Sequence, residues 1–272
     1  MSEIELSQEH IAKALAGWDG FIRFKPTQMD AMMDRFKYKT IALFFGNQAG
    51  KTCTIAKQYV KRLLGIHPIE DKNRLMKKVR CMSSTLPESS TPDEQDNTQY
   101  LELKKLIPYE LIEKDITARS QNLVIKRPVG LSSQKTVFEF RSSKQELQDV
   151  GKIQLSSVWH DEETPKRHRE ECRMRLLAED GDELFSLTPI NYISYLWDDV
   201  WQQAAFIFRT KIISEVLGLP QVERRKTGKS IGCIQAATDD NPTLDPDSIN
   251  RIFEDITDPD ELAIRRYAVF KQ

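Results

Sequence analysis

The sequence predicts an α/β domain in which a central, mostly parallel sheet is flanked by helices. Short apolar runs of β-forming residues alternate with amphipathic helical stretches, a pattern typical of strands joined by crossover helices. A glycine-containing turn joins the first clear strand to the first long helix, and after about residue 240 the pattern becomes helical and acidic. The 272 residues are enough for one sizeable domain with a small C-terminal subdomain.

The individual elements follow from local patterns. Residues 40–45 (TIALFF) form an apolar run such as a buried parallel strand has. From Thr52 to residue 64 apolar residues line one helical face, and Gly65 lies where a helix commonly ends. Residues 87–98 are rich in Ser, Thr, Pro, Asp and Asn and predict a loop. Further strands are expected at 79–84, 155–160, 183–189 and 207–213, and a hairpin of 123–127 with 136–141. Helices are expected at 7–16, from Pro26 onward, from the acids after 160 to near Gly181, and at 192–204.

Composition excludes several classes of protein. With 39% hydrophobic and 30% charged residues, the chain is neither disordered nor collagen-like. Its apolar runs are too short to span a bilayer, and its N-terminus lacks the pattern of a signal peptide, so we expect a soluble, cytoplasmic protein without a membrane partner. The four cysteines are scattered, which favours reduced thiols over a zinc site or disulfides.

Charge is balanced overall but uneven along the chain. The formal net charge is −1, which does not indicate a nucleic-acid binder by itself. Residues 35–80 are nonetheless basic, and residues 237–262 are acidic. The candidate DNA contacts are the 72–80 cluster together with Arg224, Arg225, Lys226 and Lys229, and for each of them a solvated surface is the alternative.

The strongest local signal is FFGNQAGKT (44–52) between the predicted strand and helix. Main-chain amides of such a loop, with the N-terminus of the following helix, bind phosphate oxygens. Lys51 is expected to neutralise the β- and γ-phosphates, and Thr52 to place its hydroxyl on Mg²⁺. The expected nucleotide-binding residues of the loop are Gly46, Asn47, Gln48, Ala49, Gly50, Lys51 and Thr52. The usual first glycine position is occupied by Phe45, and the glycine comes one residue later, at Gly46.

A second triplet, Gly228-Lys229-Ser230, lacks both a preceding apolar strand and a following amphipathic helix. We therefore interpret it as a basic surface turn.

Three acids end another short strand, in VWHDEE (158–163). Adjacent acids at a strand's carboxyl end suit ATP hydrolysis, with Asp161 in the Mg²⁺ shell and Glu162 as the catalytic residue that activates a water. Two alternatives remain open: the acids form the first turn of the next helix, where they interact with its dipole, or they bind a transition metal together with His160 and His168.

These motifs together resemble the ATPase half of the large terminase subunit, the motor that packages DNA into tailed-phage heads. FKPTQ (24–28) resembles the family's glutamine motif, FGNQAGKT its Walker A loop, VWHDEE its Walker B strand with catalytic glutamate, and SLTP (186–189) its coupling motif. DDNPTL (239–244) and ELAIRRYAVF (261–270) resemble the segment that leads out of the ATPase domain.

The resemblance implies a P-loop ATPase fold with an additional strand between the loop and the catalytic acids (the ASCE class). Residues 1–240 would form the ATPase core with an N-terminal helical extension, and residues 241–272 a lid or linker leading to a nuclease domain absent from this chain, so no nuclease activity is expected. Gln28 would read the adenine, while Ser186 and Thr188 would sense the γ-phosphate. A basic residue acting on a neighbouring subunit is expected among Arg141, Lys144 and Lys152.

The implied substrate is ATP with Mg²⁺. The implied partners are double-stranded DNA, a portal protein carrying a homo-oligomeric ring of this chain, and a small terminase subunit, in the host cytoplasm. Two other functions stay open from the residues: a helicase-like nucleic-acid motor, and an assembly module that binds nucleotide without turnover.

Overall fold

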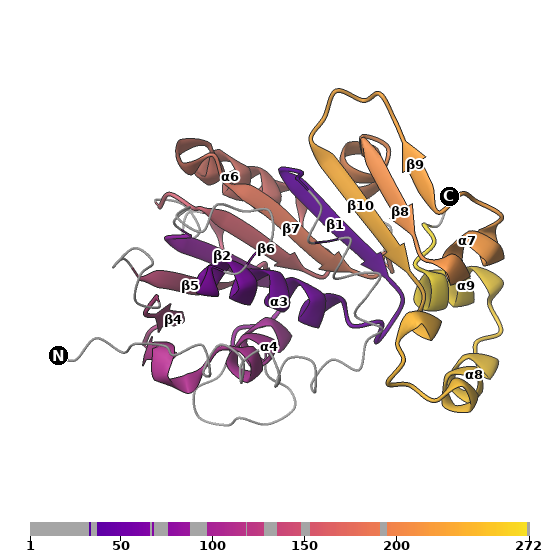
Figure 1. Ribbon diagram of the computed structural model, residues 1–272, viewed down its shortest axis with the longest axis horizontal. Helices are drawn as coiled ribbons and strands as arrows, with labels where there is room; N and C mark the ends of the chain where they lie inside the picture. Colours follow the sequence, from indigo (N-terminus) through magenta and orange to yellow (C-terminus); the bar gives the residue numbers. More distant parts are fainter. Residues whose placement is uncertain are drawn as a thin grey trace. The chain divides into compact units, whose positions relative to one another are not determined.

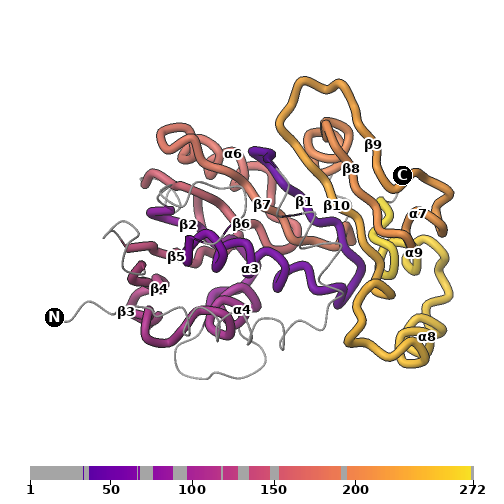
Figure 2. The backbone as a smooth tube through the Cα atoms, viewed as in Figure 1, coloured from indigo at the N-terminus to yellow at the C-terminus, as the bar shows by residue number. Residues whose placement is uncertain are grey.

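The computed structural model describes residue 33 and residues 37–65, 67, 76–87, 97–117, 119–127, 135–147, 153–190 and 195–270. The chain divides into two compact units, one formed by Thr52–Glu183 and one by the segment that ends at Lys51 together with the segment that begins at Leu184. Each unit contains both parallel and antiparallel strand pairs, with helices packed on the strands (Figures 1 and 2). Within the described residues, no helix is long and apolar enough to cross a membrane.

The sheet of the first unit has the strand order β3-β4-β5-β2-β6. Its strands are β2 (Lys78–Ser83), β3 (Ile112–Lys114), β4 (Asn122–Ile125), β5 (Thr136–Ser142) and β6 (Ser157–Asp161). Strand β2 pairs in parallel with β5 and β6, whereas β4 pairs antiparallel with β3 and β5. The expected hairpin of 123–127 with 136–141 is confirmed, as are the expected strands at 79–84 and 155–160, to within two residues at each end.

Helices cover both faces of this sheet. They are α3 (Lys51–Leu64), α4 (Thr98–Leu106), α6 (Lys166–Leu176) and the short 3-10 turns η1 (Tyr109–Leu111) and η2 (Leu177–Glu179). Successive residues of β6 point to opposite faces. Ser157 and Trp159 contact Tyr59 of α3, while Val158 packs with Cys172 of α6. Helices α3 and α6 therefore lie on opposite faces of β6, and both were expected from the sequence, whereas α4 was not.

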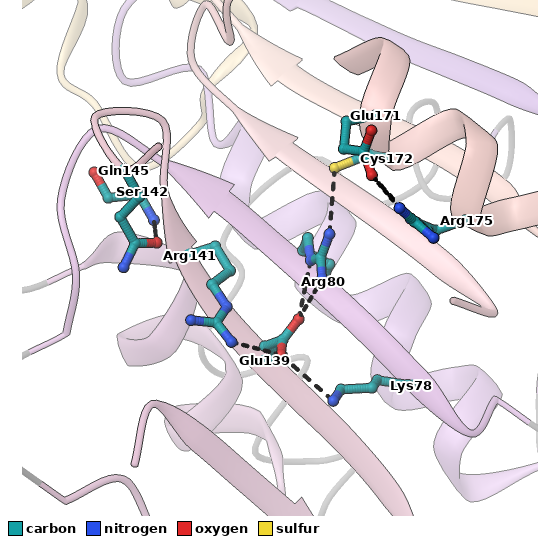
Figure 3. A network of polar contacts seen from close by, with 9 residues as sticks. All are labelled: Lys78, Arg80, Glu139, Arg141, Ser142, Gln145, Glu171, Cys172 and Arg175. Carbon is teal, nitrogen blue, oxygen red and sulfur yellow. Dashed lines mark hydrogen bonds and ion pairs between the residues drawn. The ribbon is translucent and has the colours of Figure 1, made fainter. Parts of the chain in front are cut away.

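A buried charge network ties β2, β5 and α6 together (Figure 3). The Nε of Arg80 donates to Glu139 at 2.9 Å, and Lys78 and Arg141 contact the same carboxylate at 3.4 and 3.0 Å. Burial acts to raise the pKa of Glu139, but these three cations outweigh it and lower that pKa. Because Arg80 is 1% exposed and paired within the chain, its inclusion in the 72–80 cluster of candidate DNA contacts was wrong.

The sheet of the second unit has the order β7-β1-β10-β8-β9. Its strands are β1 (Thr40–Phe45), β7 (Asp182–Leu187, whose first two residues belong to the first unit), β8 (Phe206–Arg209), β9 (Val222–Arg224) and β10 (Ile231–Ala236). Strand β10 pairs in parallel with β1 and β8, and β9 runs antiparallel at the edge. Strand β10 was not expected, while the exposed turn expected at Gly228-Lys229-Ser230 precedes it.

The helical elements of this unit are the π-helix η3 (Leu196–Trp201), α7 (Lys211–Leu217), the 3-10 turn η4 (Thr238–Asp240), α8 (Pro246–Glu254) and α9 (Pro259–Tyr267). Phe44 of β1 packs against Trp201 and Phe270, with ring centroids 5.3 and 4.9 Å away, so the C-terminal segment is part of the core. The acidic helical segment expected after residue 240 is confirmed. The strand expected at 207–213 ends at Arg209, because Thr210 caps α7.

The helix expected at 7–16 lies outside the described residues. So does the helix expected from Pro26, apart from Met33, which is helical and buried.

Candidate functional site

The candidate phosphate loop lies between β1, which ends at Phe45, and α3, which begins at Lys51. The amide of Ala49 donates to the carbonyl of Gly46 at 3.2 Å, which closes a tight turn. Gln48 and Gly50 adopt left-handed backbone conformations with φ of 56° and 81°. All seven loop residues named from the sequence therefore lie in the strand–loop–helix arrangement that the motif predicts, with Lys51 and Thr52 in the first turn of α3.

The loop is held in place by the C-terminal segment of the same unit. Thr238 Oγ1 donates to the carbonyl of Asn47 at 2.8 Å, and Asn241 Nδ2 donates to the carbonyl of Gln48 at 2.6 Å. The amide of Asn47 in turn donates to the carbonyl of Arg265 at 2.7 Å. Side chains of Thr238 and Asn241 thus fix the main chain of the loop, a role that the sequence motifs did not reveal.

This packing explains why the first glycine of the loop is at position 46 instead of the usual motif position, which is Phe45. The side chain of Phe45 is fully buried at the end of β1. At Gly46 a Cβ atom would lie 2.3 Å from the carbonyl oxygen of Arg266 and 2.6 Å from Thr238 Oγ1. Real Cβ contacts are never so short, so position 46, rather than 45, requires glycine in this chain.

The predicted metal ligands meet within the first unit. Thr52 Oγ1 donates to Asp161 Oδ1 at 3.2 Å, although the two residues are far apart in sequence. Asp161 is the last residue of β6 and is 4% exposed. Alternation along β6 directs it, like Ser157 and Trp159, toward α3. A hydroxyl next to a carboxylate is an all-oxygen donor set of the kind that Mg²⁺ prefers, so these residues fit the expected ion.

Asp161 has a second hydroxyl partner that the sequence analysis missed. Thr98 Oγ1 donates to Asp161 Oδ2 at 2.8 Å. Thr98 is the first residue of α4, in a segment whose composition resembles a loop.

Glu162 follows directly, at the point where the chain leaves the sheet. Its side chain is exposed, and its φ is +62°, a left-handed conformation that non-glycine residues seldom adopt. The amide of Thr164 donates to its carbonyl at 3.0 Å. Such outliers occur at functional sites more often than elsewhere, which favours a functional role for this acid. Helix α6 begins only at Lys166 and has no acid in its first turn, so the helix-dipole interpretation of the three acids was wrong.

His160 points to the other face of β6, toward α6. Its Nε2 lies 3.2 Å from Glu183 Oε1, and Arg169 forms two hydrogen bonds of 3.0 Å to the same carboxylate. Burial lowers the pKa of His160. Burial acts to raise the pKa of Glu183, but hydrogen bonding with His160 and the charge of Arg169 outweigh it and lower that pKa to about 2.

His168 contacts the carbonyl of Gln145. Within the described ranges there is no group of three or more His, Cys, Asp or Glu that could hold a metal.

The two residues of the coupling motif are buried on and just after β7. Thr188 Oγ1 donates at 2.7 Å to the carbonyl of Phe45, immediately before the loop. Ser186 is fully buried. Thr188 is therefore connected to the base of the loop through the main chain of β1.

The three basic candidates differ in placement. Arg141 is paired with Glu139, whereas Lys144 is exposed in the turn after β5. Lys152 lies outside the described residues, as does Gln28.

A cavity of about 320 Å³ lies in the second unit between the loop and the C-terminal helices. Asn47 and Gln48 form one wall, and the opposite wall is mostly apolar side chains of α8, among them Ile249 and Phe253. The loop is thus joined to the C-terminal helices by a few hydrogen bonds beside an open space, not by a continuous apolar core.

The chain matches no family model and no curated protein. Among solved structures it is similar to the large terminase ATPase domain of Thermus phage P74-26, with a TM-score of 0.64 and 16% identity over 99% of this chain and 100% of that one. It is also similar to the large terminase of a thermophilic bacteriophage in complex with ADP, with a TM-score of 0.57 and 15% identity. That match covers 95% of this chain and 52% of the longer terminase chain. The chain therefore has the P-loop fold of phage large terminase ATPase domains.

Proposed function

We propose that this chain is the ATPase motor domain of a viral DNA-packaging terminase, which hydrolyses ATP to move double-stranded DNA into a procapsid. The observation that carries the proposal is the hydrogen bond between Thr52, at the start of the helix after the phosphate loop, and Asp161, at the end of β6. The fold likeness supports it, since the similar structures are terminase ATPase domains and one of them was solved with ADP.

The loop residues would bind and orient the nucleotide. Main-chain amides of residues 46–52 and the N-terminus of α3 suit the phosphate oxygens, and the amine of Lys51 suits the β- and γ-phosphates. Thr52 and Asp161 would hold Mg²⁺, which when bound neutralises charge on the phosphates. Glu162 would orient and deprotonate the attacking water. Its exposure and its position one residue after Asp161 support this role.

Thr188, Ser186 and the lid segment from residue 241 onward would convert loss of the γ-phosphate into movement. Thr188 contacts the strand that carries the loop, and Asn241 contacts the loop itself. A change in the loop backbone therefore alters hydrogen bonds at both places, which gives the two nucleotide states different contacts with the lid.

In an oligomeric ring on a portal protein, with a small terminase subunit as a further partner, this movement would act on DNA in the host cytoplasm. DNA contacts would be mainly to the phosphate backbone, because a motor must ignore sequence. The exposed Lys226 and Lys229 near the edge strand β9 suit this role better than the buried Arg80. The basic residue that acts on the neighbouring subunit would be Arg141, Lys144 or Lys152. Of Arg141 and Lys144, which lie in the described residues, Lys144 is favoured because it is exposed.

Two variants test the proposal through separate readouts. Lys51→Ala should abolish binding of a non-hydrolysable ATP analogue, because the phosphate charge is no longer neutralised. Glu162→Gln should keep that binding and lower phosphate release by roughly 10²- to 10⁴-fold, the usual contribution of a general base. Retained affinity in the first variant would overturn the assignment of the loop.

Unchanged turnover in the second variant would overturn the role of Glu162. Nucleotide binding without any turnover in the wild type would favour an assembly module. ATP-dependent separation of DNA strands would favour a helicase-like motor.

A further inference from the structure

Thr98 forms a hydrogen bond to the carboxylate at the centre of the candidate site. Asp161 accepts from Thr52 through Oδ1 and from Thr98 through Oδ2, at 3.2 and 2.8 Å. Each carboxylate oxygen therefore has its own hydroxyl donor. The contact with Thr98 is the shorter of the two, and it comes from a segment to which the sequence motifs assign no function.

The structure holds Thr98 in place from two strands. Its neighbour Asn97 caps α4 by accepting from the amide of Tyr100 at 3.0 Å, and its Nδ2 donates to Ser83 Oγ at 2.7 Å, at the end of β2. On the other side, Gln99 Nε2 donates to the carbonyl of Trp159 in β6 at 3.0 Å. Asn97 and Gln99 are both almost fully buried. The start of α4 is thus fixed to the carboxyl end of β2 at Ser83 and to β6 two residues before its end at Asp161. The hydroxyl of Thr98 therefore has a defined position.

We propose that Thr98 is a positioning residue, whose hydroxyl holds Oδ2 of Asp161 so that Oδ1 stays directed at Thr52 for binding Mg²⁺. The inference rests on the proposed function. Its physical basis is that the terminal torsion of an aspartate is broad, so a carboxylate takes one orientation only where a partner fixes it. Partners that orient metal-binding carboxylates typically change metal affinity by about 10- to 100-fold when they are removed.

A purely structural role at the start of α4 is the competing explanation, and three variants separate it from positioning. Thr98→Val keeps the shape of the side chain but removes the donor, and Thr98→Ser keeps the donor. Asn97→Ala is the matched control, because it removes the cap and the bond to Ser83 but leaves the Thr98 hydroxyl. If Thr98→Val does not fold, Thr98→Ala is used in its place.

The experiment measures binding of a non-hydrolysable ATP analogue by calorimetry, first without Mg²⁺ and then over a Mg²⁺ titration. For Thr98→Val we expect unchanged affinity without Mg²⁺ and a 10- to 100-fold increase in the Mg²⁺ concentration that gives half of the full effect. Thr98→Ser should restore the wild-type value. Asn97→Ala should lower the thermal midpoint but shift the Mg²⁺ dependence much less than Thr98→Val does, because the Gln99 bond to β6 still holds the start of α4.

Three results would overturn the inference. If Thr98→Val requires the same Mg²⁺ concentration as the wild type, Thr98 does not position Asp161. If Asn97→Ala shifts the Mg²⁺ dependence as much as Thr98→Val does, the effect comes from α4 as a whole. In both cases the proposed function stands, because the wild type still binds with Mg²⁺. If the wild type binds no analogue at all, both the inference and the proposed function fail.

Discussion

Glu183 is predicted to be a main electrostatic contributor to the stability of the first unit. Its carboxylate and the Arg169 guanidinium are 2% and 4% exposed, and two hydrogen bonds of 3.0 Å join them. Lowering the pKa of Glu183 from its ordinary 4.5 to about 2 corresponds to about 3 kcal/mol of folding free energy, at 1.36 kcal/mol per pH unit. Studies of other buried ion pairs lead to a similar magnitude, because removing one partner of such a pair typically costs about 3–5 kcal/mol of stability. We therefore expect Glu183→Gln to lose about 3 kcal/mol at pH 7.

The pH dependence gives a second readout with a defined sign. Because the pKa of Glu183 is lower in the folded state, its contribution is complete above about pH 5 and is lost as the pH falls toward 2. His160 faces the same carboxylate, and burial lowers the pKa of His160 while Glu183 raises it, so the comparison between the two pH values is made with His160→Asn in both proteins. The difference between the proteins with and without Glu183→Gln should therefore shrink by roughly 1 kcal/mol between pH 7 and pH 4.

Urea unfolding followed by circular dichroism at both pH values measures these quantities. Glu171→Gln is the matched control. Glu171 pairs with Arg175 on α6, the helix that also carries Arg169, but this pair is partly exposed, and such pairs contribute only about 0.5 kcal/mol. If Glu183→Gln is no less stable than Glu171→Gln, or if its deficit is the same at pH 4 as at pH 7, the reasoning from burial and pairing is refuted.

Two further predictions concern the loop and the cysteines. Asn241→Ala removes the donor to the Gln48 carbonyl and should cost about 1 kcal/mol of stability, together with a several-fold loss of nucleotide affinity, measured by urea unfolding and calorimetry. In the folded protein a thiol reagent should label Cys53 before the other cysteines, and bound nucleotide should slow that labelling, because Cys53 follows Thr52 and is only half-buried. Mass spectrometry of the labelled peptides would show it, and early labelling of any buried cysteine would contradict it. The buried cysteines are Cys81, Cys172 and Cys233, and burial raises the pKa of each thiol, that of Cys172 to about 11.

The sequence predicts best those parts of the site whose signal is local. The run TIALFF, the loop glycines and the apolar face after Thr52 are contiguous, so strand, loop and helix were all expected, and the structure confirms them. The end of β6 at Asp161 followed from the same kind of signal. The expected strand at 207–213 was wrong at its end, because the β-branched pair Ile212 and Ile213 belongs to a short helix that Thr210 begins and Gly218 ends.

The contacts that the sequence did not reveal are those made across long separations. Thr98 and Asp161 are 63 positions apart, and Thr98 belongs to a helix whose start is rich in residues common in loops. Asn241 and Gln48 are 193 positions apart. Threonine and asparagine in such segments satisfy ordinary turn and cap patterns, so nothing local distinguishes a residue that reaches the site. Their roles depend on which strands lie next to each other, which strand patterns alone do not specify.

The position of Asn241 has a consequence for how the loop communicates with the C-terminal helices. Coupling between a nucleotide and a distant helix requires contacts that differ between the two states. Thr238 and Asn241 bind carbonyl oxygens of the loop itself, so any rotation of the peptide groups at Asn47 or Gln48 must change these bonds directly. The apolar side chains of α8 face Asn47 and Gln48 across a cavity of about 320 Å³. If the chain couples nucleotide state to its C-terminal helices as proposed, the hydrogen bonds to the loop carbonyls would carry differential free energy between the two states.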